Sequence, residues 1–175
     1  MKYKDLTHIT NFTKEQTARI EVISVNKYFN SIFAGKKCKV QAVNNVSFQI
    51  NRGDKFGIIG TSGCGKTTLA RIVLGLIKPD SGTVNKYGKI GFVAQDPYAS
   101  LSPNMTVREI VKEPLRFLSK INKSKEIELV DNALNAVHLK PLKYADRLPS
   151  KLSGGKRQRV SIARAIVIRP DFLVM

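Results

Sequence analysis

One stretch in the first half of the chain constrains the fold more than any other. It runs from Gly60 to Thr68, reads Gly-Thr-Ser-Gly-Cys-Gly-Lys-Thr-Thr, and fits the pattern G-x-x-x-x-G-K-[ST]. An apolar, β-prone run over 56–59 leads into it and a helical run over 68–74 leads out. A strand, a glycine-rich loop and a helix in this order aim backbone N–H groups and a helix N-terminus at one point, which suits a polyphosphate. A plain glycine-rich turn is the alternative, and the complete motif in this context disfavours it.

The residue types of this loop predict how it binds a nucleoside triphosphate. Glycines at 63 and 65 let the backbone approach phosphate oxygens, and their N–H groups form an anion-binding nest. Lys66 can place a positive charge between the β- and γ-phosphates, and the Thr67 hydroxyl can complete a Mg²⁺ shell. The candidate binding residues are Gly60, Ser62, Gly63, Cys64, Gly65, Lys66, Thr67 and Thr68.

Size and charge limit the classes of protein that fit. The chain has 175 residues, 42% of them hydrophobic, which allows one domain with a core. The net charge of +17 raises nucleic acid or an anionic membrane surface as a partner, but no block of five or six like charges appears, which favours a solvated basic surface. The sequence shows no apolar run of membrane-spanning length and no signal peptide. We therefore expect a cytoplasmic chain, with Cys38 and Cys64 reduced and no zinc site.

The pattern of apolar residues changes from strand-like to helix-like at Gln95. The expected strands lie over 20–28, 40–43, 46–50, 56–59, 83–84 and 89–93. Beyond them, Thr106 and Glu109 form a capping box for a helix that Pro114 should interrupt. Ser124 is the expected N-cap of a second helix, and a loop is expected to follow over 141–149.

A second motif, Leu152-Ser153-Gly154-Gly155, opens another helix and offers a second anion-binding helix N-terminus. Alone it is a weak signal, typical of an ordinary cap. With the phosphate loop upstream and Gln95 at a strand end between them, it resembles the ATP-binding-cassette (ABC) ATPases. The motif looks like their signature, Gln95 like their Q-loop glutamine, and Phe29 like their adenine-stacking aromatic residue, with Tyr28 as the alternative.

The run from Gln95 to Val107, Gln-Asp-Pro-Tyr-Ala-Ser-Leu-Ser-Pro-Asn-Met-Thr-Val, is similar to that of ATPase subunits of oligopeptide, dipeptide and nickel importers. The resemblance covers about residues 20–175. It implies an α/β fold, an incomplete P-loop NTPase nucleotide-binding domain of the ABC type with an N-terminal antiparallel β region and a helical subdomain. The implied division is an extension over 1–19, an ATP-binding core over 20–98, a helical subdomain over 99–150, and the signature helix with the start of the Walker B strand over 151–175.

The resemblance also implies a function: an ATP-binding subunit that couples ATP to uptake of peptides or nickel, with ATP and Mg²⁺ as cofactors. Ser153, Gly154 and Gly155 would contact a nucleotide held by a second ATPase subunit, identical or different. Gln95 would act in catalysis and join Thr67 at the metal. Further implied partners are membrane permease subunits and, indirectly, an extracytoplasmic solute-binding protein, which places the chain at the cytoplasmic face of the membrane.

Two departures from the family pattern bear on these expectations. Lys156 stands where the family usually has glutamine. The sequence also stops at Met175, before the family's Walker B aspartate and glutamate, its switch histidine and a strand of the central sheet. We therefore expect a gap in the sheet, weak nucleotide binding and no ATP hydrolysis by this chain alone. There are two alternatives. One is a soluble ABC-type ATPase that acts on nucleic acid, although nucleic acid is otherwise a disfavoured partner. The other is a non-functional remnant.

Overall fold

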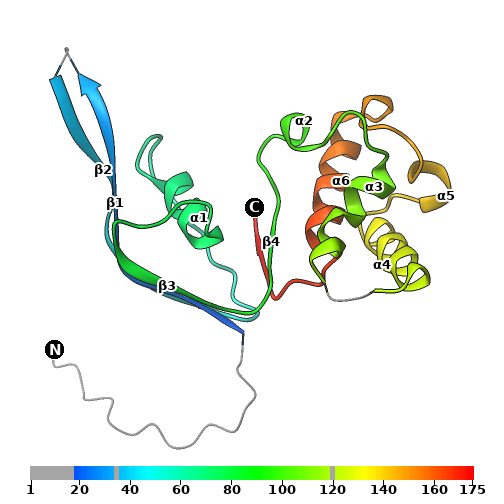
Figure 1. The fold of residues 1–175 in the computed structure, drawn as a ribbon, viewed down its shortest axis with the longest axis horizontal. Helices are drawn as coiled ribbons and strands as arrows, with labels where there is room; N and C mark the ends of the chain where they lie inside the picture. Colours follow the sequence, from blue (N-terminus) through cyan, green and yellow to red (C-terminus); the bar gives the residue numbers. More distant parts are fainter. Residues whose placement is uncertain (1–17, 34–35, 119–120) are drawn as a thin grey trace, which may run out of the picture.

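A long antiparallel ribbon forms one side of the protein. The computed structural model describes residues 18–33, 36–118 and 121–175, and in it β1 (Arg19–Phe33) pairs with β2 (Lys36–Asn51) along nearly its whole length (Figure 1). The two strands expected over 40–43 and 46–50 are therefore one strand, and this expectation was wrong. β1 lies opposite both segments and holds them in one ladder, with register shifts that absorb the irregularity.

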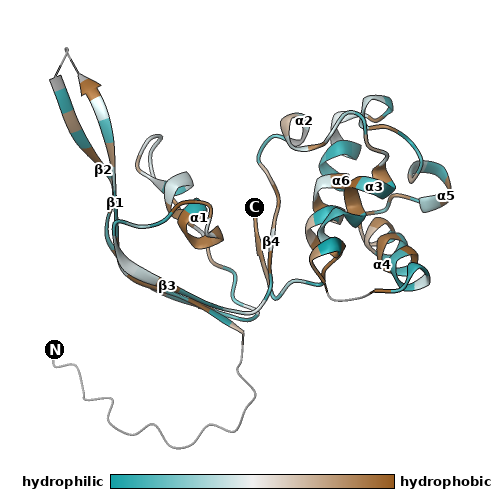
Figure 2. Ribbon diagram, in the orientation of Figure 1, coloured by the Kyte–Doolittle hydropathy of each residue, from teal (hydrophilic) through white to brown (hydrophobic). Residues whose placement is uncertain are grey.

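The ribbon and one helix enclose the first hydrophobic core. Strand β3 (Ser81–Tyr87) pairs with β1 on the side away from β2, which gives the antiparallel order β2-β1-β3. Helix α1 (Lys66–Leu74) follows the phosphate loop and turns its apolar side to this sheet (Figure 2). The buried residues of this core are Ile20, Val22, Val25, Val43, Leu69, Ile72 and Val73.

Two short parallel strands lie between the ribbon and the helices. Strand β4 (Ile90–Phe92) pairs with β5 (Phe172–Val174), and the helices lie between the two in sequence (Figure 1). The strand expected over 56–59 is absent: β4 and β5 pair with each other, and 54–60 pairs with neither of them. Phe56 stacks instead on Phe48, with ring centroids 4.8 Å apart.

An apolar hollow lies where we expected a gap in the sheet. It has a volume of about 590 Å³ and separates 54–58 and α1 from β5. Its apolar lining includes Phe48, Ile58, Val73, Leu173 and Met175. Ile59 is 96% exposed, so the segment before the phosphate loop buries little of its apolar surface.

Helices and short turns form the other side of the protein around a second core. They are α2 (Pro97–Ser100), α3 (Val107–Lys112), the 3₁₀ turn η1 (Glu113–Phe117), α4 (Lys123–Ala136), α5 (Pro141–Tyr144), the 3₁₀ turn η2 (Pro149–Lys151) and α6 (Gly154–Ile166). The core residues run from Leu101 to Val167 in sequence and include Val107, Leu134 and Val160. Helix α6 therefore packs with the helices that precede it.

Local signals decided most of these helix boundaries. The capping box of Thr106 and Glu109 is present, and the helix it opens gives way to η1 at Pro114, as expected. The N-cap of α4 is Asn122, not Ser124, because the Asn122 side chain accepts a hydrogen bond from the N–H of Lys125 at 2.8 Å. The loop expected over 141–149 contains α5 and the start of η2, each with a proline in its first turn. No helix in the described parts of the chain is long and apolar enough to cross a membrane.

Candidate nucleotide-binding site

The phosphate loop adopts a conformation that requires glycine at two positions. Gly63 has φ 80° and Gly65 has φ 95°, both in the left-handed region that side chains disfavour. A Cβ atom at Gly65 would also overlap the carbonyl oxygen of Ala42 on β2. Gly65 is the N-cap of α1 and has no side chain to cap it. The first N–H groups of this helix therefore face the loop without a side-chain acceptor, as an anion-binding site needs.

Lys66 folds back over the loop that precedes it. Its Nζ donates to the carbonyl oxygens of Gly60 at 2.8 Å and Thr61 at 2.6 Å, and lies 3.6 Å from the sulfur of Cys64. These are neutral acceptors, and an ammonium group makes stronger hydrogen bonds to phosphate oxygens. The lysine ammonium thus lies within the loop, where the oxygens of an anionic ligand would replace the carbonyl oxygens as its hydrogen-bond acceptors.

The residues present fit a polyphosphate better than an independent metal site. The described residues contain no cluster of three or more histidine, cysteine or acidic side chains that could hold a metal. The exposed side chain of Thr67 can supply one hard oxygen ligand. Mg²⁺ usually keeps several waters and takes its remaining ligands from phosphates, so one hydroxyl beside a phosphate cradle fits this ion.

The signature motif leaves its own helix N-terminus uncapped. Ser153 is the N-cap of α6, with φ −68° and ψ 160°, yet its hydroxyl makes no capping hydrogen bond. Thr106, in the same position on α3, accepts from the N–H of Glu109. A Cβ atom at Gly155 would meet no atom within 4 Å. The start of α6 is therefore an open donor site that can receive an anion from outside the chain.

A tyrosine joins the Q-loop segment to the signature helix, and sequence reasoning missed it. The Tyr98 hydroxyl lies 3.3 Å from the position a Cβ atom at Gly154 would take, and the Arg157 guanidinium carbon lies 4.3 Å from the Tyr98 ring centroid. The Nε of Arg157 donates to the carbonyls of Pro149 and Leu152 at 2.9 and 3.1 Å. No sequence rule pairs these residues, because the contact crosses between two helices.

The other predicted site residues lie apart from the phosphate loop. Gln95 is exposed, between β4 and α2. Phe29 is on the ribbon opposite Val40, with the Lys27 ammonium 5.7 Å from its ring centroid. Within the described residues, no hydrogen bond joins the phosphate loop to Gln95, Phe29 or Ser153. The roles of these residues stay predictions.

The alternative aromatic residue, Tyr28, has an electrostatic role in the ribbon. Its backbone N–H donates to Asp80 at 2.7 Å, and the Lys27 ammonium lies 2.9 Å from the same carboxylate. These two donors hold the pKa of Asp80 below its ordinary value of 3.8. Tyr28 is thus tied through its backbone to the turn before β3, and its ring, like that of Phe29, is 41% exposed.

The comparison with known protein families decides the identity of the fold. The pattern of the ABC transporter family matches residues 43–175, which contain both the phosphate loop and the signature motif. This chain belongs to the ABC transporter family. Among curated relatives, YkfD from Bacillus subtilis, described as an oligopeptide transport ATP-binding protein, is 41% identical over 173 residues, covering 89% of this chain and 52% of YkfD.

A nickel importer component and a solved cassette are also similar to this ABC family member. The nickel import ATP-binding protein NikE from Shigella dysenteriae is 35% identical over 164 residues, covering 85% of this chain and 61% of NikE. The dimeric structure of the ABC transporter cassette MJ0796 is 30% identical with a TM-score of 0.75, covering 88% of this chain and 72% of that cassette. The chain thus has the mixed α/β fold of ABC ATPase cassettes and spans about half the length of the curated relatives it matches.

Proposed function

We propose that this chain is an ATP-binding subunit of an ABC importer for peptides or nickel, in which ATP binding and hydrolysis by the assembled importer are coupled to solute uptake. One observation carries the proposal. The chain presents two open anion-binding helix N-termini, at Gly65 and at Ser153, with no side-chain cap on either. Two such sites in one chain suit a nucleotide shared between subunits. The similarity to YkfD and NikE supports the solute class.

The residues of the phosphate loop bind and orient the nucleotide. The N–H groups after Gly63 and Gly65 hold phosphate oxygens, and Lys66 turns from the carbonyls of the loop to the phosphates. The Thr67 hydroxyl and Gln95 would hold the Mg²⁺, and the ion would neutralise part of the phosphate charge. Phe29 stacks on the adenine. Of these contacts, only the stacking on adenine involves the ribbon, because Phe29 lies on β1.

The second site acts on the nucleotide of another subunit. Ser153, Gly154 and Gly155 meet the γ-phosphate held by the partner ATPase, and Tyr98 fixes the helix that bears them to the segment after Gln95. The dimeric form of MJ0796 bound to ADP and Pi supports this arrangement. Residues 20–98 form the ATP-binding core and 99–150 the helical subdomain, which docks on a membrane permease at the cytoplasmic face.

Uptake measurements in the host cell test this function. Deleting the gene should abolish uptake of labelled dipeptide, oligopeptide or nickel. Wild type supplied in trans should restore it, and Lys66→Ala should not, because the phosphates lose their point charge. Uptake that is unchanged for all three solutes would contradict the proposal.

The net charge of +17 favours one second candidate, an ABC-type ATPase acting on nucleic acid. Duplex DNA or RNA binding that falls steeply with salt, together with unchanged uptake in the deletion strain, would support that candidate. Binding to nucleic acid that is weak at physiological salt, with uptake lost, would reject it.

A further inference from the structure

The side chain that departs from the family pattern, Lys156, lies in a group of cations around one aromatic ring. Its Nζ is 5.4 Å from the Tyr144 ring centroid. The Lys143 ammonium lies 5.6 Å from the same centroid and the Arg147 guanidinium carbon 5.5 Å. We call these four residues the Tyr144 cluster. Lys143 and Arg147 are close to Tyr144 in sequence, and the fold brings Lys156, from the first turn of α6, to the same ring.

The Tyr144 cluster concentrates positive charge without a carboxylate to balance it. Across the described ranges, none of its three cations forms a salt bridge, while Asp146 turns to Arg108, with Nε and Oδ1 3.6 Å apart. A cation–π contact attracts each cation to the ring, whereas cations around one ring repel one another within a Debye length. Lys156 also lies in the first turn of α6, where the helix dipole disfavours a positive charge. An anion at this place would relieve both effects.

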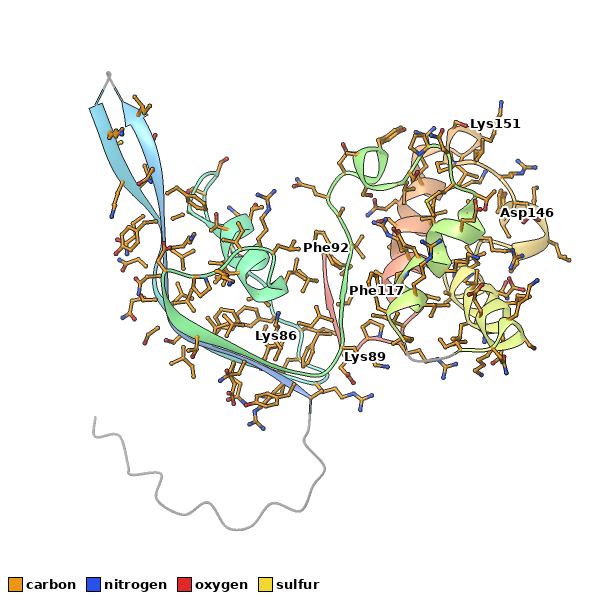
Figure 3. All side chains as sticks on the ribbon, viewed as in Figure 1. Lys86, Lys89, Phe92, Phe117, Asp146 and Lys151 are labelled. Atoms are coloured by element: carbon orange, nitrogen blue, oxygen red, sulfur yellow. The ribbon has the colours of Figure 1, made fainter. Side chains whose placement is uncertain are left out.

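The cluster borders a hollow that can admit the side chains of another polypeptide. The hollow has a volume of about 610 Å³, and Lys140, Lys143 and Arg147 supply its positive charge. Its remaining lining residues are Asn135, Pro141 and Leu142, the last of which is fully exposed. Helix α5 lies at the end of the protein furthest from the ribbon (Figure 1), and Asp146 and Lys151, which lie between the cluster residues in sequence, are on the same outer side (Figure 3).

We propose that the Tyr144 cluster and its hollow form a docking surface for an acidic, partly apolar segment of a partner protein. Carboxylates match the three cations, and an apolar side chain covers Leu142. The shallow hollow places the exposed Leu142 beside the cations, which suits a polypeptide segment that carries an apolar side chain next to its carboxylates. The confinement of the cations to 140–156 differs from the long basic stripe that nucleic acid requires. The surface goes beyond the proposed function, which assigns permease docking to 99–150 without naming the residues that dock or the chemistry of the segment they take.

A peptide titration without nucleotide tests this surface. The probe is a fluorescein-labelled peptide of about twelve residues that alternates glutamate with leucine, compared with the same peptide carrying glutamine. We expect the acidic peptide to bind residues 1–175, its affinity to fall with salt, and the glutamine peptide to bind at least about tenfold more weakly. The triple variant Lys143→Gln, Arg147→Gln, Lys156→Gln should lose at least about tenfold in affinity.

A matched variant separates the cluster from the net charge. Lys37→Gln, Lys39→Gln, Lys55→Gln removes the same charge from exposed positions elsewhere, and we expect its affinity to stay within about twofold of wild type. Lys156→Gln alone restores the residue usual in the family, so it should fold and still weaken binding. Far-ultraviolet circular dichroism checks folding of each variant.

Three outcomes would overturn the proposal. One is an equal loss of affinity in the two triple variants, which would make the binding a property of net charge. Another is no peptide binding, together with binding to phosphatidylglycerol vesicles that depends on the Tyr144 cluster, which would assign the surface to lipid. The third is no peptide binding, together with binding to duplex DNA that depends on the Tyr144 cluster, which would assign the surface to nucleic acid. Because nucleotide is absent throughout, failure here leaves the proposed function standing, and failed uptake leaves this surface standing.

Discussion

The core of the helical part of the protein is closed, whereas the core beside the phosphate loop is open on one side. Val107 and Leu134 in the helical core are 0% exposed. In the other part Ile59 is 96% and Met175 85% exposed, and an apolar hollow separates α1 from β5. The helices are neighbours in sequence and complete their backbone hydrogen bonds internally. A strand needs a partner from elsewhere in the chain, so the segment 54–60 has no regular structure.

Truncating an apolar side chain in each part should show the largest difference. Leu134→Ala leaves a cavity in a closed core, and we expect it to lower the free energy of unfolding by about 3 kcal/mol. Ile59→Ala removes atoms already in water and should change it by less than about 0.5 kcal/mol. Urea denaturation followed by circular dichroism measures both. An equal cost would show that Ile59 is packed in solution and that the two parts do not differ.

Replacing one glycine with alanine in each anion site should change the stability of the protein in opposite directions. Gly65→Ala forces a left-handed φ on alanine and overlaps the Ala42 carbonyl, so we expect a cost of about 2–3 kcal/mol. Gly155→Ala meets open space in α6 and should stabilise by up to about 1 kcal/mol. Thermal unfolding measures both variants. A destabilised Gly155→Ala would mean that the start of α6 is not open.

A buried hydroxyl offers a smaller gain in the helical part. Ser161 on α6 is 0% exposed, and its hydroxyl has no hydrogen-bond partner in the described structure. Ser161→Ala removes this desolvated group and favours the helix, so we expect about 0.5–1 kcal/mol of added stability. Val160→Ala, its buried neighbour, serves as a control that should destabilise. If Ser161→Ala also destabilises, the hydroxyl has a partner in solution and the core is less dry than the structure shows.

The smallest effects should come from two exposed carboxylates, one in each part. Hydrogen bonds from Tyr28 and Lys27 lower the pKa of Asp80, and the N–H and hydroxyl of Thr106 lower the pKa of Glu109. A carboxylate with a lowered pKa stabilises the fold above its ordinary value and loses this contribution as the pH falls through the folded value. Asp80→Asn and Glu109→Gln should thus be less stable than wild type at neutral pH.

The stability differences between wild type and these two variants should become smaller as the pH falls. For Asp80→Asn this occurs below pH 3.8 and for Glu109→Gln below pH 4.5, the ordinary values of the two groups. Melting temperatures measured across this range test the sign. A difference that grows as the pH falls would show that the native contacts favour the protonated carboxyl.

The sequence predicted those features whose causes are local. The capping box at Thr106, the break at Pro114 and the helix start at Ser153 each depend on residues within one turn, and all three are present. The choice between Asn122 and Ser124 as N-cap failed because both residue types cap helices and lie two positions apart.

Features that depend on distant residues could not be predicted. To predict that 56–59 forms no strand, one would have to know that β4 and β5 pair with each other. The stacking of Tyr98 on Arg157 and the contact of Lys156 with Tyr144 cross between elements, and no spacing rule finds them. At the candidate site, the sequence found both motifs from their glycines, while their relation in space depends on the fold.

The central claim is that the two motifs are halves of different nucleotide sites, and titration with ATP tests it most directly. At concentrations where the chain is monomeric, Lys66→Ala should weaken binding of a fluorescent ATP analogue by at least about tenfold, because it removes the charge that meets the phosphates. Ser153→Ala should leave the affinity within about twofold of wild type, because its hydroxyl serves another subunit's nucleotide. Equal losses in the two variants would contradict the account, since both motifs would then hold one nucleotide within a single chain.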